Sequence, residues 1–359
     1  MTVLTERAGT DGTAAPAVTE TTLRPRYEGC NINTWIGFKH VNYLVEEAVL
    51  DHVRTVGLPA GALYEVHGLC LELVAVDTRI LTALHVDDEV RARVSATGAP
   101  LARGEEGRPE TRLRVVLTVE RAGAPVKAVT ATVTVAVRLD DRAARGLSAA
   151  AAALEAPPAA ADPSGLGLRP ISRIRREAGR AGAPELAGVG ASPPPGGRAG
   201  RGVVTPIGEF GLTRAPASAN GVVWSWRIPY FYCHFTERLQ LTGYLRIMEE
   251  IVDILLAERG VSIRRLLDDR NWIPVVPHSS VALLDEARME EEVHTFFTVT
   301  DIFKDFTYTA RMDSYVIRDG LLVPTATGSI THGYAVIQNR RDWSLVSFDD
   351  RLLGALRGG

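Results

Sequence analysis

The sequence contains little of what marks several large classes of protein. Only three of its 359 residues are cysteine, which is too few for a disulfide framework, and they lack the spacing of a metal site. Its formal net charge is −3, so no strong basic field favours nucleic acid as a partner. It has no phosphate-binding glycine loop, nucleotide fingerprint or metal motif. We therefore expect no metal, no nucleotide cofactor and no nucleic-acid partner.

Long apolar runs are also missing. No stretch approaches the roughly 18 uninterrupted apolar residues that a membrane-spanning helix needs. The first 20 residues are small and polar, without the apolar core of a signal peptide. Hydrophobic residues nevertheless make up 46% of the chain, which is typical of a globular protein. We expect a cytoplasmic protein with no membrane partner.

Composition divides the chain into four parts. We expect residues 1–22 to form a disordered leader, 23–140 a first folded domain and 219–359 a second one. Between the domains, residues 141–218 are rich in Ala, Pro, Gly and Arg, as in "AAAAALEAPPAAADPSG" and "GASPPPGGRAGRG". Such a stretch has too little apolar surface to offset the entropy that it would lose on ordering. We therefore predict a disordered linker there.

The two domains repeat each other at an offset of 203 residues. No gap is needed from residue 46 to residue 90, and a constant offset over such a span indicates an internal duplication. The matched residues are Glu46 and Glu249, Glu47 and Glu250, Val49 and Val252, Gly57 and Gly260, and Glu89-Val90 and Glu292-Val293.

Each repeat predicts one long helix followed by about four antiparallel strands. Apolar residues recur at helical spacing in 41–53 and again in 245–256, and Gly57 and Gly260 supply C-terminal stops. Alternating runs such as "TRLRVVLTVER" and "VKAVTATVTVAVRL", joined at "RAGAP", indicate strands and a hairpin. The helix must pack across a curved sheet, because only the sheet can cover its apolar stripe. The predicted fold class is α+β.

This order of elements resembles the hot-dog fold, and its duplication resembles a tandem, or double, hot-dog protein. "YLVEEAVLDHVRTVGL" (residues 43–58) is similar to acyl-carrier-protein thioesterases, and "YLRIMEEIVDILLAERGVSIRRLL" (244–267) is similar to acyl-CoA thioesterases of the hydroxybenzoyl-CoA kind. The resemblance implies two units with their sheets joined edge to edge, an acyl-CoA or acyl-carrier-protein thioester as substrate, and room for a homo-oligomer. Such enzymes often carry Asp or Asn shortly before a His-Val-Asn-Asn run. Here His40-Val41-Asn42 lacks the second Asn and the preceding Asp.

Three residues near the start of the first helix are candidate catalytic groups: His40, Asn42 and Glu47. The N-terminal amides of a hot-dog helix face the thioester carbonyl, where negative charge develops during the reaction. Hydrolysis needs a carboxylate or a histidine to activate water, and a polar group to orient it. For Glu47 a purely stabilising role is the alternative, because acids in the first turns of a helix interact favourably with its dipole.

In the second half, His234 and Glu237 lie just before the helix and are candidates as well. His234 has the alternative of a packed strand residue, and His332 in "GSITHGYAV" is expected to be a satisfied core histidine. The two halves have diverged most at these positions. We therefore predict one productive site at the junction, built on the three residues of the first helix. The second half should mainly shape an acyl tunnel, with Glu237 as the exception.

The resemblance, taken with these residues, implies a thioesterase-like enzyme of fatty-acid or polyketide-type metabolism. It would need no cofactor beyond the CoA or phosphopantetheine that carries its substrate. Two alternatives stay open. A 3-hydroxyacyl-thioester dehydratase would use a histidine base and a carboxylic acid, often from facing units. A non-catalytic hot-dog protein would bind an acyl chain or carrier protein without reaction.

Overall fold

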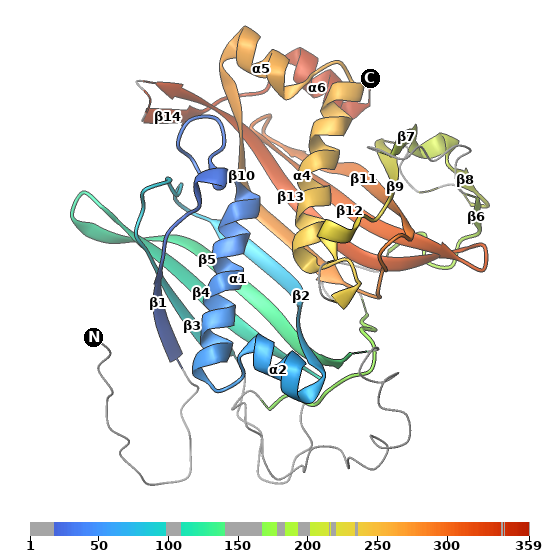
Figure 1. The fold of residues 1–359 in the computed structure, drawn as a ribbon. Helices are drawn as coiled ribbons and strands as arrows, with labels where there is room; N and C mark the ends of the chain where they lie inside the picture. Colours follow the sequence, from blue (N-terminus) through green and yellow to red (C-terminus); the bar gives the residue numbers. More distant parts are fainter. Residues whose placement is uncertain are drawn as a thin grey trace.

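The structure is a computed structural model that describes residues 18–97, 109–140, 167–177, 184–192, 202–214, 216, 220–233, 236–338, 340 and 342–358. Two similar halves lie side by side, and each packs one long helix against its part of a curved sheet (Figure 1).

The duplication extends through three consecutive elements of identical length. The long helices α1 and α4 have 18 residues each, and each is followed by an eight-residue helix and a twelve-residue strand. Each long helix is followed by a glycine in the left-handed region, Gly57 (φ 96°) and Gly260 (φ 72°), the usual stop for a helix. The bounds are Phe38–Thr55 (α1), Ala60–His67 (α2), Leu69–Ile80 (β2), Leu241–Glu258 (α4), Ile263–Arg270 (α5) and Trp272–Leu283 (β10).

A 12-stranded sheet runs through both halves, in the order β1-β3-β4-β5-β2-β10-β13-β12-β11-β9-β7, with β14 paired to β13. The halves join where β2 and β10 pair antiparallel, with Ala75 opposite Ala282 and Arg79 opposite His278. The tandem hot-dog architecture, with sheets joined edge to edge, is thereby confirmed. The other strands are Val18–Leu23 (β1), Val90–Thr97 (β3), Glu110–Arg121 (β4), Ala124–Leu139 (β5), Val203–Pro206 (β7), Gly221–Arg227 (β9), Glu292–Phe303 (β11), Thr307–Arg318 (β12), Leu321–Gln338 (β13) and Asp342–Leu345 (β14).

Both long helices lie on the same face of the sheet and contact each other (Figure 1). In α1 the buried positions Val41, Val45 and Val49 follow helical spacing, which forms the apolar stripe that faces a sheet. One core of buried residues spans both halves. The remaining helices of the described segments are α6 (Asp350–Arg357) and the short 3₁₀ turns η1 (Tyr27–Gly29), η3 (Ile207–Glu209) and η4 (Tyr230–Tyr232).

Parts of the expected leader and linker are ordered, which differs from our expectation. Residues 18–22 belong to β1, which pairs with β3 along its whole length. Within 141–218 the structure contains β7 and a two-stranded sheet of β6 (Ala191–Ser192) and β8 (Gly211–Leu212). Residues 1–17 of the leader and 141–166, 178–183, 193–201, 215 and 217–218 of the linker lie outside the described residues.

The linker pieces are ordered because a few apolar residues each fill a specific place. Leu186, Val189, Ile207 and Phe210 are buried in a small core of their own, against strands of the second half. Ile174 is buried in the main core. Average composition conceals such isolated anchors, since the Ala, Pro and Gly around them dominate the count.

Residues 171–177 form a strap across the junction of the halves. Arg176 donates to the Glu110 carboxylate on β4 at 2.5 Å. It also donates to the carbonyls of Val74 on β2 and Leu283 on β10, both at 3.1 Å. Because β2 and β10 belong to different halves, one guanidinium group connects the two.

Candidate active site

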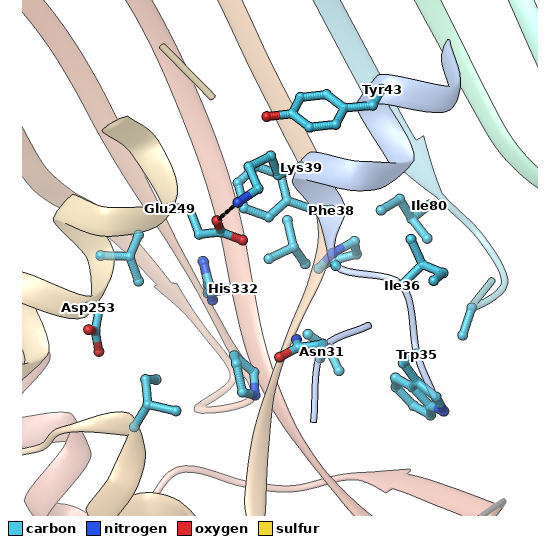
Figure 2. A pocket seen from close by; sticks show the side chains of 18 of the residues that line it. Asn31, Trp35, Ile36, Phe38, Lys39, Tyr43, Ile80, Glu249, Asp253 and His332 are labelled. Atoms are coloured by element: carbon cyan, nitrogen blue, oxygen red, sulfur yellow. Dashed lines mark ion pairs between the residues drawn. The ribbon is translucent and has the colours of Figure 1, made fainter. Parts of the chain in front are cut away.

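A cleft of about 920 Å³ lies at the junction, between the N-terminal end of α1 and α4. Residues of β10, β13 and β14 complete its wall on the side of the second half, and residues 80–83, at the end of β2 and just after it, line the first-half side. Figure 2 shows Lys39 of α1 and Glu249 of α4 meeting across it. The cleft therefore lies where the sequence predicts the productive site, at the junction of the halves.

The start of α1 is open to this cleft. Gly37 is the N-cap, and no acidic residue occupies the first turn. A Cβ at Gly37 would lie 3.9 Å from Oε1 of Glu249, so the absence of a side chain there leaves space between the helix end and that carboxylate. The amides of Phe38 and Lys39 are the first two of the helix and have no intrahelical acceptor. They give this end of the cleft a partial positive charge.

An ion pair connects the two long helices at the same place. Lys39 Nζ lies 2.6 Å from Oε2 of Glu249. One turn further along α1, the Tyr43 hydroxyl accepts a hydrogen bond of 2.9 Å from Arg246 Nε. The Arg246 guanidinium also lies 5.5 Å from the centre of the Tyr232 ring. These contacts hold a lysine, a carboxylate and the helix amides together at one end of the cleft.

The cleft carries more acids than bases. Its charged lining residues are the cations Lys39 and Arg246 and the acids Glu28, Glu249, Glu250 and Asp253. A field of this sign repels anions. None of these four acids is fully buried, and Glu249 pairs with Lys39.

Asn42, a predicted site residue, is buried in the joint between the halves. Its side-chain amide donates to the Phe38 carbonyl (2.9 Å) and to the Ser279 hydroxyl (3.3 Å), and its oxygen accepts from the Thr78 hydroxyl (2.7 Å). Thr78 and Ser279 face each other across the β2–β10 pair. These three bonds satisfy Asn42, and they give it a structural task at the junction.

His40 lies beside the cleft and does not line it. Its ring packs on Gly29, where an added Cβ would approach the His40 Cβ to 2.8 Å, and meets the Tyr43 ring edge-on at 5.1 Å. Burial, helped by the charge of Lys39, lowers the pKa of His40. The imidazole is therefore neutral near pH 7.

The adjacent acids of α1 have different surroundings. Glu47 is 47% exposed, and its contact with Arg26 is long, at 3.9 Å; it is not part of the cleft lining. Glu46 is half-buried, and burial raises the pKa of its carboxyl to about 7, with the charge of Glu47 adding to the effect and Arg246 opposing it. Only Glu46 turns away from solvent.

The second-half candidates are not brought to the cleft. Glu237 has a left-handed backbone (φ 57°) in the loop before α4, where its carbonyl accepts from the Met289 amide. It does not line the cleft. His234 lies outside the described residues. The catalytic roles of all five candidates stay predictions, while the geometry points to residues that the sequence analysis did not favour.

Sequence reasoning did not propose Lys39 for the site, and it gave Glu249 less weight than Glu47. The duplication held a partial signal, because it matches Glu249 with Glu46 and so marks both as helix positions of the same kind. What it cannot show is that the start of α1 lies opposite the middle of α4. That relation exists only once the sheets join.

His332 also lines the cleft, from β13. It is 5% exposed, as a core residue should be. Contrary to expectation it is not satisfied: within the described part of the chain, neither ring nitrogen has a hydrogen-bond partner. Its ring stacks on Tyr308 at 5.5 Å. Burial lowers the pKa of His332 to about 3, so this imidazole is neutral.

Among the residues that the structure describes, no helix has the length and apolar character needed to cross a membrane. No group of three or more His, Cys, Asp or Glu residues in these segments has an arrangement that could hold a metal ion.

Comparisons by sequence find no matching family model and no matching curated protein. Comparison of structures does find similar folds. The 12:0-ACP thioesterase from Umbellularia californica superposes with a TM-score of 0.52 at 10% identity, covering 88% of this chain and 94% of its own. An acyl-ACP thioesterase from Bacteroides thetaiotaomicron gives 0.50 at 9% identity, covering 88% and 97%.

A third similar structure, from Lactobacillus plantarum and provisionally assigned as an oleoyl thioesterase, gives a TM-score of 0.51 at 10% identity, covering 90% of this chain and 99% of its own. Identities this low carry the fold and no residue-level roles. The matches extend over both halves. The chain therefore has the double hot-dog fold that these thioesterases share.

Proposed function

We propose that the protein hydrolyses an acyl thioester carried on CoA or on an acyl carrier protein. The observation that carries the proposal is the meeting of a helix N-terminus, a lysine and a carboxylate in one cleft, with 2.6 Å between Lys39 and Glu249. The fold shared with thioesterases agrees with it. A cleft of about 920 Å³ is of the size that small-molecule ligands occupy.

In the proposed reaction the thioester carbonyl faces the start of α1. The amides of Phe38 and Lys39 stabilise the negative oxygen that forms when water attacks the carbonyl carbon, and the Lys39 ammonium adds a positive charge beside it. Glu249 accepts a proton from the attacking water. The carbon–sulfur bond then breaks, and the thiolate leaves and takes up a proton, which gives a free acid and a thiol.

In this scheme α1 binds the oxyanion, and the opposing helix α4 supplies the base. Glu47 would have to reach the cleft from an exposed position, whereas Glu249 already lies there. The site is therefore composite, with one half supplying the amides and the other the carboxylate. Fatty-acid or polyketide-type metabolism, a cytoplasmic location and a homo-oligomer stay predictions.

Incubation with a panel of acyl-CoA and acyl-carrier-protein thioesters, followed by mass spectrometry of the products, tests the proposal. We expect free acid and free thiol in amounts that grow with enzyme concentration. Loss of one water molecule, about 18 mass units, from a 3-hydroxyacyl thioester would instead identify a dehydratase. Unchanged thioesters that bind tightly would favour the non-catalytic alternative.

A further inference from the structure

Among the described residues, two buried polar side chains in the cleft lack a hydrogen-bond partner, and neither takes part in the proposed reaction. Neither nitrogen of His332 has a hydrogen-bond partner, and the indole nitrogen of Trp35, 8% exposed, has none either, among the residues described. Both side chains line the cleft, Trp35 from the first half and His332 from the second (Figure 2). Buried polar groups are nearly always hydrogen-bonded, so such exceptions ask for an explanation.

The surroundings of His332 define what would satisfy it. The lining contributed by the second half includes the apolar side chains of Val252, Ile263 and Val275, beside the acids Glu249, Glu250 and Asp253. Tyr308 covers one face of the imidazole, which leaves the ring edge for a ligand. A neutral imidazole offers one donor and one acceptor. It matches a hydroxyl or carbonyl group better than a charged one, because His332 is buried and an unpaired charge is costly in a buried place.

We infer that the cleft selects acyl chains that carry an oxygen, as a hydroxyl or keto group along the chain, and that His332 is the residue that recognises it. This inference rests on the proposed function, since it takes the chain to extend from the start of α1 along the second-half wall. A fully saturated chain would bury His332 with both nitrogens unpaired. An oxygenated chain of equal length would supply the missing bond.

The residue acts on specificity and not on the reacting atoms. A site built around a hydrogen-bonding group discriminates strongly against a ligand that lacks the partner, because its own polar atoms are then left unpaired. The expected signature is therefore a difference in kcat/KM between an oxygenated and a saturated substrate. Chemistry at the thioester should be the same for both.

The test compares decanoyl thioesters of pantetheine with their 5-, 7- and 9-oxo counterparts. For the wild-type protein, kcat/KM should be at least about ten-fold higher for one of the oxo chains than for the saturated chain. His332→Phe should abolish that preference, so that the saturated and oxo chains give similar kcat/KM values. His332→Gln, which keeps a donor and an acceptor, should restore part of it.

Equal kcat/KM for the saturated and all oxo chains in the wild type would overturn the inference, as would a preference that His332→Phe leaves intact. If His332→Phe does not fold, the comparison of wild type with His332→Gln and His332→Leu decides in the same way. The same preference should appear in the dissociation constants of the non-hydrolysable amide analogues, measured by calorimetry. Binding with this preference but without hydrolysis would refute the proposed function alone, whereas hydrolysis without the preference would refute only the inference.

Discussion

Glu249 is the residue on which the proposed chemistry depends most. Replacing its carboxylate with an amide removes the base and keeps the shape, so Glu249→Gln should lower kcat by about 10²–10⁴-fold. Its melting temperature should stay close to that of the wild type, because the side chain is 44% exposed. Glu47→Gln is the matched control on the facing helix, and steady-state kinetics on one thioester measure both. A large loss in the control with normal turnover of Glu249→Gln would return the role to Glu47.

Glu46 should make stability depend on pH. Its folded-state pKa is raised to about 7, above the value near 4.3 of an unfolded chain. The folded state therefore prefers the protonated carboxyl, and stability is lost as pH rises from about 4 to about 7. Glu46→Gln should match the wild type near pH 4.5 and gain on the order of 1–3 kcal/mol above pH 7. Urea unfolding at several pH values measures this, and a gain that is the same at every pH would contradict it.

At the scale of elements, the β2–β10 joint has one polar end and one apolar end. Asn42 bonds to the facing pair Thr78 and Ser279 at the polar end. At the offset of 203 residues that relates the two halves, Leu245 corresponds to Asn42. In the same strand pair, Val76 faces Val281. The duplication has therefore produced two versions of the same contact, one hydrogen-bonded and one hydrophobic.

Asn42→Leu alone should destabilise the fold by about 2–4 kcal/mol, because two buried hydroxyls lose their partner. The triple variant with Thr78→Val and Ser279→Val copies the apolar end and should recover most of that loss. Denaturant unfolding of the two variants measures the difference. A triple variant no more stable than the single one would show that the polar end has a geometry of its own, which the apolar set cannot replace.

The strap 171–177 should stabilise the junction through one side chain. Arg176→Ala removes bonds to both halves and should cost about 2 kcal/mol, since hydrogen bonds that involve charged groups are worth about 1.5–3 kcal/mol. Arg175 is the neighbouring arginine and is exposed, so Arg175→Ala should change stability by less than about 0.5 kcal/mol. Equal effects in thermal unfolding would mean that the strap does not bind through Arg176.

For the whole molecule, the sequence predicts the fold better than the site. Helical spacing, alternating strands and the offset of 203 residues are local or periodic signals, and they lead to the double hot-dog. The site depends on which residues meet across the junction. Asn42 has the residue type of a catalytic group and the contacts of a structural one. Glu249 looks like a repeat of Glu46, and only the packing of α4 against the start of α1 distinguishes the two.

That packing also predicts that substrate reacts at the N-terminus of α1 and not at the N-terminus of α4. The N-cap of α1 is Gly37, and its counterpart at the start of α4 is Gln240. Gly37 has an ordinary helix-entry backbone (φ −63°) and room for a Cβ, so Gly37→Leu should fold normally. Its side chain would occupy the space between the start of α1 and Glu249, and kcat/KM should fall at least about 100-fold as the carbonyl is displaced.

The matched variant is Gln240→Leu, which places the same side chain at the start of α4. In α4 the residue that corresponds to Lys39 is Thr242, so the start of α4 lacks the cation of the ion pair. Turnover of the variant should stay within about two-fold of the wild type, because surface changes away from a site have small effects. Circular dichroism of both variants checks the fold. An equal loss of kcat/KM in the two would mean that both helix ends bind substrate, and a loss in Gln240→Leu alone would place the chemistry at the opposite end of the junction.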